Sequence, residues 1–143
     1  MQHPSQQLLD EVWHSCAPDV LQTDWIDLAH LHLPATLSVM PVLRAGLPVD
    51  AAALPARVLL EGAVSGAGLT TDWSLAAQLA QRTQLVLAGG LNAGNVAGAL
   101  AQVHPFGIDV SSGVESAPGQ KDPALIEQFI GTARATWAGR GIR

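Results

Sequence analysis

Five short apolar runs without polar alternation constrain the fold of this chain more than any other feature of its sequence. They cover residues 20–24, 37–43, 57–62, 84–90 and 107–113. A strand with one face in water alternates apolar and polar residues, whereas a parallel strand covered on both faces is apolar throughout. We therefore predict an α/β fold with about five parallel strands, joined by connections that return the chain to the same end of the sheet.

Helical patterns lie before, between and after these runs. They cover residues 5–16, 72–82, 92–103 and 122–137. Asp72, Asn92 and Asp122 each stand where an N-cap is expected, because a short polar side chain can accept the unpaired N–H groups of the first turn. Pro123 occupies the first position of the last helix, where its fixed φ suits the helix and its missing N–H costs nothing.

Composition excludes several classes of protein. The chain has 143 residues, 13% of them charged, and a net charge of −5, which argues against binding to nucleic acid. It has no apolar run of the ~18 residues that a membrane span needs, and its first residues do not resemble a signal peptide. The single cysteine, Cys16, excludes an internal disulfide and a multi-cysteine metal site. We expect a cytoplasmic protein without membrane contact, metal or cofactor.

Repeated strand–helix units of this length fit either an open doubly wound sheet or a (β/α)8 barrel. The glycine fingerprint that follows the first strand of a dinucleotide-binding sheet is absent there, and the nearest match is "SGAG" at 65–68. Small residues gather instead after the last three runs, and barrels build phosphate sites from the loops after their last two strands. Because a full barrel needs eight strands, we predict one incomplete barrel domain over residues 1–143.

Four segments of the chain resemble phosphoribosylanthranilate isomerase, a (β/α)8 barrel enzyme of tryptophan biosynthesis. "LVLAGGLNAGNV" at 85–96 and "GIDVSSGVESAPGQKD" at 107–122 are similar to its last two strand–loop units. "VSGAGLTTDWSLA" at 64–76 resembles its sixth loop, and "PDVLQTD" at 18–24 its fourth strand. The family's first three strands have no counterpart, so the resemblance implies a truncated form that begins near the end of the third strand.

The resemblance implies an Amadori rearrangement of N-(5′-phosphoribosyl)anthranilate, in which an acid protonates the ring oxygen and a base removes the C2′ proton. Glu61 takes the place of the family's aspartate acid, and the leucines before it predict an apolar wall that raises its pKa. The family's catalytic cysteine belongs to a strand that is not matched here. Cys16 lies on a predicted helix and is expected to pack as a small hydrophobe. We therefore expect the 143-residue chain alone to be nearly inactive.

Phosphate binding is the function that the residues themselves predict best. Gly89 and Gly90 allow the backbone to approach an anion closely, and Asn92 with the amides after it presents N–H groups. Further hydroxyl and amide donors stand at the end of the last run, at Ser111, Ser112 and Gly113. Oriented amides supply positive potential, so this prediction requires no lysine or arginine.

Two more charged residues are expected to contribute to this site. Asp109 alternates with apolar neighbours, so we predict that it faces the barrel interior or mouth, where it hydrogen-bonds a substrate hydroxyl or orients Ser111. Arg44 ends the second apolar run. It is expected either to contact the anthranilate carboxylate or to pair with Glu61.

Other functions fit the same pattern. A half-barrel without catalytic activity would bind a phosphorylated ligand or pair with another chain, because five strands leave two open edges. Self-association through these edges is one form of that hypothesis. An unrelated barrel enzyme that shares only the phosphate site is a third alternative, which the "DW" and "SSGVE" segments disfavour.

Overall fold

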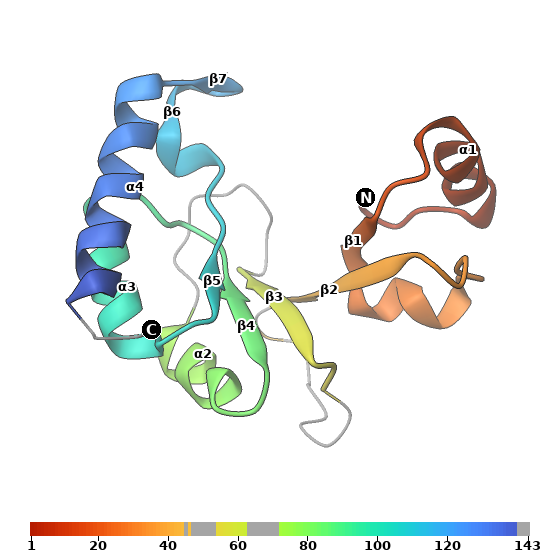
Figure 1. The fold of residues 1–143 in the computed structure, drawn as a ribbon, viewed down its shortest axis with the longest axis horizontal. Helices are drawn as coiled ribbons and strands as arrows, with labels where there is room; N and C mark the ends of the chain where they lie inside the picture. The colour runs from red at the N-terminus through yellow and green to blue at the C-terminus, as the bar shows by residue number, and fades with distance from the viewer. Residues whose placement is uncertain (45, 47–53, 63–71, 140–143) are drawn as a thin grey trace.

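A five-stranded parallel sheet forms the centre of the computed structural model, which describes residues 1–44, 46, 54–62 and 72–139 (Figure 1). The strands follow one another in sequence order, and every neighbouring pair is parallel. They are β1 (Val20–Asp24), β2 (Ser38–Arg44), β3 (Arg57–Glu61), β4 (Gln84–Leu87) and β5 (Gly107–Ile108). The predicted parallel α/β sheet is confirmed, and in the described part of the chain it is an open sheet with β1 and β5 at its edges.

Helices connect and flank the strands. The α-helices are α1 (Gln6–Cys16), α2 (Trp73–Ala80), α3 (Val96–Val103) and α4 (Pro123–Ala138), and the 3-10 turns are η1 (Trp25–His30) and η2 (Ser112–Val114). Asp72 and Asp122 cap α2 and α4 as predicted, because each carboxylate accepts hydrogen bonds from two backbone N–H groups. A small hairpin of β6 (Glu115–Ala117) and β7 (Gln120–Lys121) precedes α4. None of the described helices is long and apolar enough to cross a lipid bilayer.

The prediction that Asn92 caps a helix over 92–103 is wrong. The helix begins at Val96, and Asn95 stands at its N-cap. Asn92 instead accepts a hydrogen bond from Gly94 N–H at 2.8 Å, and its own N–H donates to Asn95 Oδ1 at 2.9 Å. Asparagine side chains compete with the helix by bonding nearby backbone groups, so these two residues form a turn before the helix starts.

Strands β4 and β5 are shorter than the predicted runs 84–90 and 107–113. β4 ends before Gly89 and Gly90, whose φ angles of 87° and 65° turn the backbone out of the extended conformation. β5 pairs with β4 over two residues before the chain leaves the sheet for η2. The small polar residues therefore form loops at the ends of the strands rather than the strands themselves.

The two faces of the sheet bury different sets of side chains. One face packs against α2, α3 and α4, which lie together on one side of β3, β4 and β5 (Figure 1). This core includes Val58, Leu60, Leu85 and Leu87, all fully buried. The opposite face carries a second cluster, Val42, Leu59 and Ala88, which are 5%, 2% and 2% exposed. Burial on both faces explains why the strands lack polar alternation.

The edge at β1 has its own small core. Leu9 of α1, Leu21 of β1 and Leu37 pack together there. Large apolar side chains nearby remain in water, since Val20 is 50% exposed and Ile26 of η1 is 64% exposed. An open strand edge with exposed apolar neighbours is a surface on which another chain can pair.

Candidate active site

Charged side chains gather at the carboxyl end of the sheet, on the face away from the helices. In the strand register Asp24 pairs with Val42, and Arg44 pairs with Glu61. Residues two apart on a strand share a face, so Arg44 lies beside Val42 and next to Asp24 on the neighbouring strand. The ends of β1, β2 and β3 thus bring two carboxylates to one guanidinium.

Arg44 holds both of these carboxylates. Its Nε donates to Asp24 Oδ1 and its Nη1 donates to Glu61 Oε2, each at 2.7 Å. The side chains of Asp24, Arg44 and Glu61 are 7%, 16% and 17% exposed. Burial alone would lower the pKa of Arg44, but the hydrogen bonds and charges of Asp24 and Glu61 raise it. Of the two roles expected for Arg44, the structure shows the pairing with Glu61.

Asp24 joins a second polar group at the end of β1. His3 Nε2 lies 3.6 Å from Asp24 Oδ2, and His3 Nδ1 lies 3.0 Å from Asp27 Oδ1. The hydrogen bond with Asp27 raises the pKa of His3. Partial burial would raise the pKa of Asp27, but hydrogen bonds from His3 and Thr23 lower it. The ring nitrogen of His3 and the carboxylate oxygens of Asp24 and Asp27 lie within 4.8 Å of one another. The pairs that His3 forms with both carboxylates, and that Asp24 forms with Arg44, explain why these groups lie so close together.

Asp109, which follows β5, lies on the same face of the sheet as Arg44 and Glu61. Gly107 pairs with Val86, so Asp109, two residues later, belongs to the face away from the helices. Loss of surrounding water and the negative charge of Glu61 raise the pKa of Asp109, and the charge of Lys121 opposes them. Glu61 and Asp109 therefore share one surface, as expected for groups around the mouth of a barrel.

We expect the Asp109→Asn variant to be slightly more stable than the parent at neutral pH. A raised pKa in the folded state means that the stability contributed by protonated Asp109 is complete below its unfolded pKa and is lost as pH rises through the folded pKa. The gain from the substitution should therefore be absent below about pH 4 and grow as pH rises above it, which urea denaturation curves at several pH values measure. Asp19→Asn, at an exposed position, is the control, and an equal gain in both variants at all pH values would contradict the expectation.

Two loops that the sequence assigned to phosphate binding are in direct contact. A Cβ atom at Gly113 would lie 1.8 Å from the carbonyl oxygen of Leu91 and 3.1 Å from Asn92 Cβ. The absence of a side chain at this position lets the loop after β5 close against the loop after β4. The two predicted halves of the phosphate site therefore lie side by side.

The N–H groups of these loops differ in their partners. Those of Ser112 and Gly113, at the start of η2, have no acceptor within the described residues. The N–H of Asn92, which was expected to face an anion, donates to Asn95 instead. Asn92 thus shapes its loop, and the amides at the start of η2 are the donors available there.

Sequence reasoning missed Lys121, the one lysine of the chain. Its Nζ donates to the carbonyl oxygen of Ser111 at 2.9 Å, to Ser111 Oγ at 3.0 Å and to Glu115 Oε1 at 2.7 Å. These bonds tie β7 to Ser111, which directly precedes η2, and to Glu115 of β6. The only signal in the sequence was position, since Lys121 is the next-to-last residue of the segment "GIDVSSGVESAPGQKD".

Cys16 does not belong to the charged cluster at the carboxyl ends of the strands. It ends α1, shortly before the amino end of β1, whereas the charged groups stand at the carboxyl ends of the strands. The prediction that it packs as a buried hydrophobe is wrong, because its side chain is exposed and its thiol donates to the Val12 carbonyl oxygen of its own helix, at 3.4 Å. The "SGAG" segment at 65–68 lies outside the described residues.

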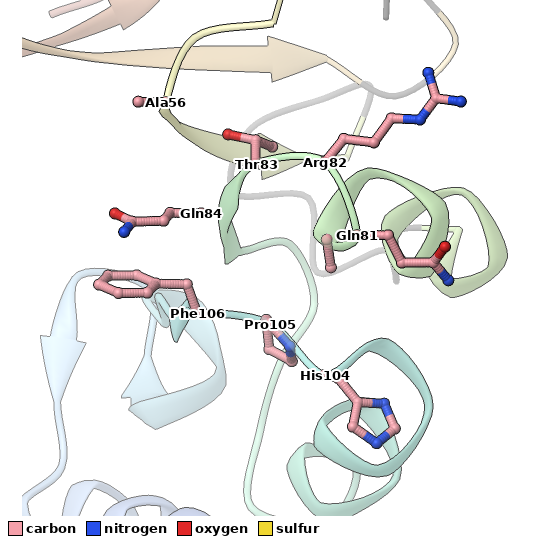
Figure 2. Close-up of a pocket in the computed structure, with 9 residues that line it drawn as sticks. Ala56, Gln81, Arg82, Thr83, Gln84, His104, Pro105 and Phe106 are labelled. Atoms are coloured by element: carbon pink, nitrogen blue, oxygen red, sulfur yellow. The ribbon is translucent and has the colours of Figure 1, made fainter. Parts of the chain in front are cut away.

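A pocket of about 450 Å³ lies at the opposite, amino end of β3, β4 and β5. Its lining includes Gln84, the first residue of β4, and Phe106, which precedes β5 and stacks under the Arg57 guanidinium at 4.6 Å. Figure 2 shows that Gln84 and Phe106 point to one side of it whereas Arg82 and His104 point to the other. In β/α barrels this end of the strands serves stability, so the candidate active site is the charged carboxyl edge.

A sequential parallel sheet with helices on one face and charged groups at the carboxyl ends of its other face defines the class of β/α-barrel enzymes. The sequence model of N-(5′-phosphoribosyl)anthranilate (PRA) isomerase matches residues 22–132. The chain belongs to this family, as its motifs predicted.

Relatives and solved structures agree with this assignment. An N-(5′-phosphoribosyl)anthranilate isomerase of Pelobacter propionicus is 54% identical over 71 residues, which cover 50% of this chain and 34% of the relative. That of Mesorhizobium japonicum is 40% identical over 89% of this chain, which spans 66% of the relative. A phosphoribosylanthranilate isomerase solved in complex with reduced 1-(o-carboxyphenylamino)-1-deoxyribulose 5-phosphate is 28% identical, with a TM-score of 0.68 over 94% of this chain and 69% of that one.

Proposed function

We propose that this chain carries the proton-donor and phosphate-binding portion of an N-(5′-phosphoribosyl)anthranilate isomerase that acts in tryptophan biosynthesis in the cytoplasm. One observation supports this above all others: the Arg44–Glu61 pair and the loops joined at Gly113 lie at the same end of one sheet. The anionic aromatic end of the substrate and its phosphate end need two such separate groups. The reduced product analogue bound by the solved relative has the same two ends.

Glu61 is the proposed general acid. It must hold a proton to deliver it to the ring oxygen as the C1′–O bond breaks, a transfer that contributes ~10²–10⁴-fold to such reactions. In the structure Glu61 accepts a hydrogen bond from Arg44. We propose that the anthranilate carboxylate takes over this guanidinium when substrate binds, so that Glu61 is released to carry the proton. Arg44 then serves both roles expected for it, one before and one after binding.

The loops after β4 and β5 are the proposed phosphate site. Gly89 and Gly90 bring the backbone close to the ligand, and the N–H groups of Ser112 and Gly113, which have no acceptor among the described residues, donate to it. Asp109 lies between this site and Glu61, where a ribose hydroxyl is the fitting partner for a carboxylate. The phosphate of the substrate would thus bind at η2, its ribose beside Asp109 and its anthranilate carboxylate at Arg44.

Binding of reduced 1-(o-carboxyphenylamino)-1-deoxyribulose 5-phosphate to the 143-residue chain tests this function. Titration calorimetry should show saturable binding that weakens by at least about tenfold when the phosphate is removed from the analogue, because charge-assisted hydrogen bonds are then lost. Glu61→Gln preserves the shape of the side chain and removes the carboxylate that competes for Arg44, so it should not weaken this binding. No binding of the analogue, or equal binding of its dephosphorylated form, would overturn the proposal.

The proposal also predicts very slow turnover by the 143 residues alone. Cys16, their one cysteine, lies towards the other end of the strands, so no thiolate among them can remove the C2′ proton. Product formation, followed by chromatographic separation of substrate and product, should therefore stay close to the uncatalysed rate. Turnover at the rate of a complete family enzyme would contradict this expectation.

A half-barrel that pairs with another chain is the second candidate function. The exposed Val20 and Ile26 beside the β1 edge favour it, because apolar groups next to the outer edge of a sheet invite a further strand. Sedimentation equilibrium distinguishes the two candidates, since pairing predicts a mass that rises with concentration. A Val20→Lys variant should then lower the association constant.

A further inference from the structure

The head of Lys121 is held by three acceptors. Its Nζ lies within 3.0 Å of both oxygen atoms of Ser111 and within 2.7 Å of Glu115 Oε1. An ammonium group has three N–H donors, so all of them are occupied. Glu115 is itself fixed, because its other oxygen accepts a hydrogen bond from Gly119 N–H at 3.0 Å. The ammonium group of Lys121 is therefore held between Glu115 of β6 and Ser111 in the loop after β5.

These contacts determine what Ser111 can offer to a ligand. Its carbonyl oxygen accepts from Lys121 and from the Val114 N–H of η2, at 2.9 Å and 3.3 Å. Its Oγ accepts from Lys121 as well, so the hydroxyl hydrogen must point away from the ammonium group. Ser111 thus keeps its hydroxyl hydrogen as a donor, and the next two residues, Ser112 and Gly113, have N–H groups with no acceptor in the described part of the chain.

The negative charge of Glu115 balances the positive charge of Lys121. The salt bridge between Lys121 and Glu115 measures 2.7 Å, with the two side chains 46% and 15% exposed. An exposed pair of this kind contributes little to stability by itself. The main effect of this salt bridge is on geometry, because it fixes the position of the Lys121 ammonium group, which would otherwise move freely in solvent.

We propose that Lys121 is a positioning residue of the phosphate site: it holds Ser111 so that the hydroxyl donates to a phosphate oxygen together with the N–H groups of η2. This inference rests on the proposed function. It adds a side chain on β7 to a site otherwise built from the loops after β4 and β5, and it replaces the expectation that the site needs no lysine.

The single lysine allows the effect to be observed directly. In a chain labelled with [13C]lysine, the side chain of Lys121 gives one Cε resonance. Ribose 5-phosphate should shift this resonance in a saturable manner, and ribose should not. A shift with both sugars, or with neither, would overturn the proposal, because the phosphate would then not be sensed at Lys121.

Affinities of variants then separate positioning from general effects of charge. Lys121→Met should weaken binding of ribose 5-phosphate about tenfold, since a hydrogen bond to a charged group is lost. Lys121→Arg should restore part of the affinity, because a guanidinium can also donate to both Ser111 and Glu115. Arg134→Met removes the same charge at an exposed position of α4 and should change affinity less than twofold. Equal losses in Lys121→Met and Arg134→Met would overturn the proposal.

A double-mutant cycle completes the test. If Lys121 acts through Ser111, then Ser111→Ala alone and Ser111→Ala with Lys121→Met should weaken binding to a similar extent. Additive losses would show that the lysine acts independently of Ser111 and would contradict the inference. Failure of the parent chain to bind the product analogue would overturn the proposed function as well, whereas phosphate-dependent binding that Lys121→Met leaves unchanged would overturn only the positioning role.

Discussion

Replacing Gly113 by alanine is expected to lower the free energy of unfolding by about 2–3 kcal/mol and to abolish phosphate-dependent binding. The new Cβ would lie 1.8 Å from the backbone oxygen of Leu91, so the loop after β5 must move away from the loop after β4. A flexible side chain could yield to such a clash, but a carbonyl group held within the opposing loop cannot. Urea denaturation gives the stability, and calorimetry with the reduced product analogue gives the binding.

Gly131 provides the matched control for this substitution. It lies within α4, and a Cβ built there has no atom of the described residues within 4 Å apart from its chain neighbours and the nearby backbone of the same helix. Gly131→Ala should therefore stabilise the chain by up to about 1 kcal/mol, since alanine favours a helix. If Gly113→Ala were tolerated as well as Gly131→Ala, the close contact between the two loops would be wrong.

Replacing Arg44 by methionine is expected to lower the free energy of unfolding by about 3 kcal/mol. The substitution keeps most of the side-chain volume but leaves Asp24, which is 5% exposed, without its guanidinium partner. A buried carboxylate without a counter-charge loses its hydration and gains nothing in return. Binding of the product analogue should weaken too, because Arg44 is the proposed partner of the anthranilate carboxylate.

The Asp24→Asn, Arg44→Met double variant tests the cause of this loss. Removing both charges should recover much of the stability, because no buried carboxylate is then left at the end of β1. Arg134→Met, at an exposed position, should change the unfolding free energy by less than about 0.5 kcal/mol. A double variant as unstable as the sum of its single variants would show that the Arg44–Asp24 contact is not what stabilises this end of the sheet.

Much of the fold could be predicted because its signals are local. Apolar runs without alternation indicated strands covered on both faces, and the two cap residues Asp72 and Asp122 predicted the starts of their helices. Strand ends were predicted less well. The left-handed Gly89 and Gly90 end β4, and the turn built by Asn92 and Asn95 delays α3, although both segments continue an apolar or helical pattern.

The candidate site was predicted in part, for a similar reason. Glu61, Arg44 and Asp109 follow apolar runs, so their place at the ends of strands could be read from the sequence. Asp24 and Lys121 were missed, because nothing local distinguishes them from other charged residues. Asp24 is separated from Arg44 by 20 positions, and only the pairing of β1 with β2 brings them together.

The sequence by itself determined the parallel sheet, its helical connections and the kind of residue at each strand end, since these depend on periodicity and capping within a few residues. Tertiary structure alone decided which charges meet. The register of β1, β2 and β3 joins Asp24 and Glu61 through Arg44, and the approach of two loops at Gly113 sets the amides of η2 beside the loop after β4. Such contacts depend on segments far apart in the chain, because hydrogen bonds and ion pairs form only after packing has brought their partners within about 3 Å.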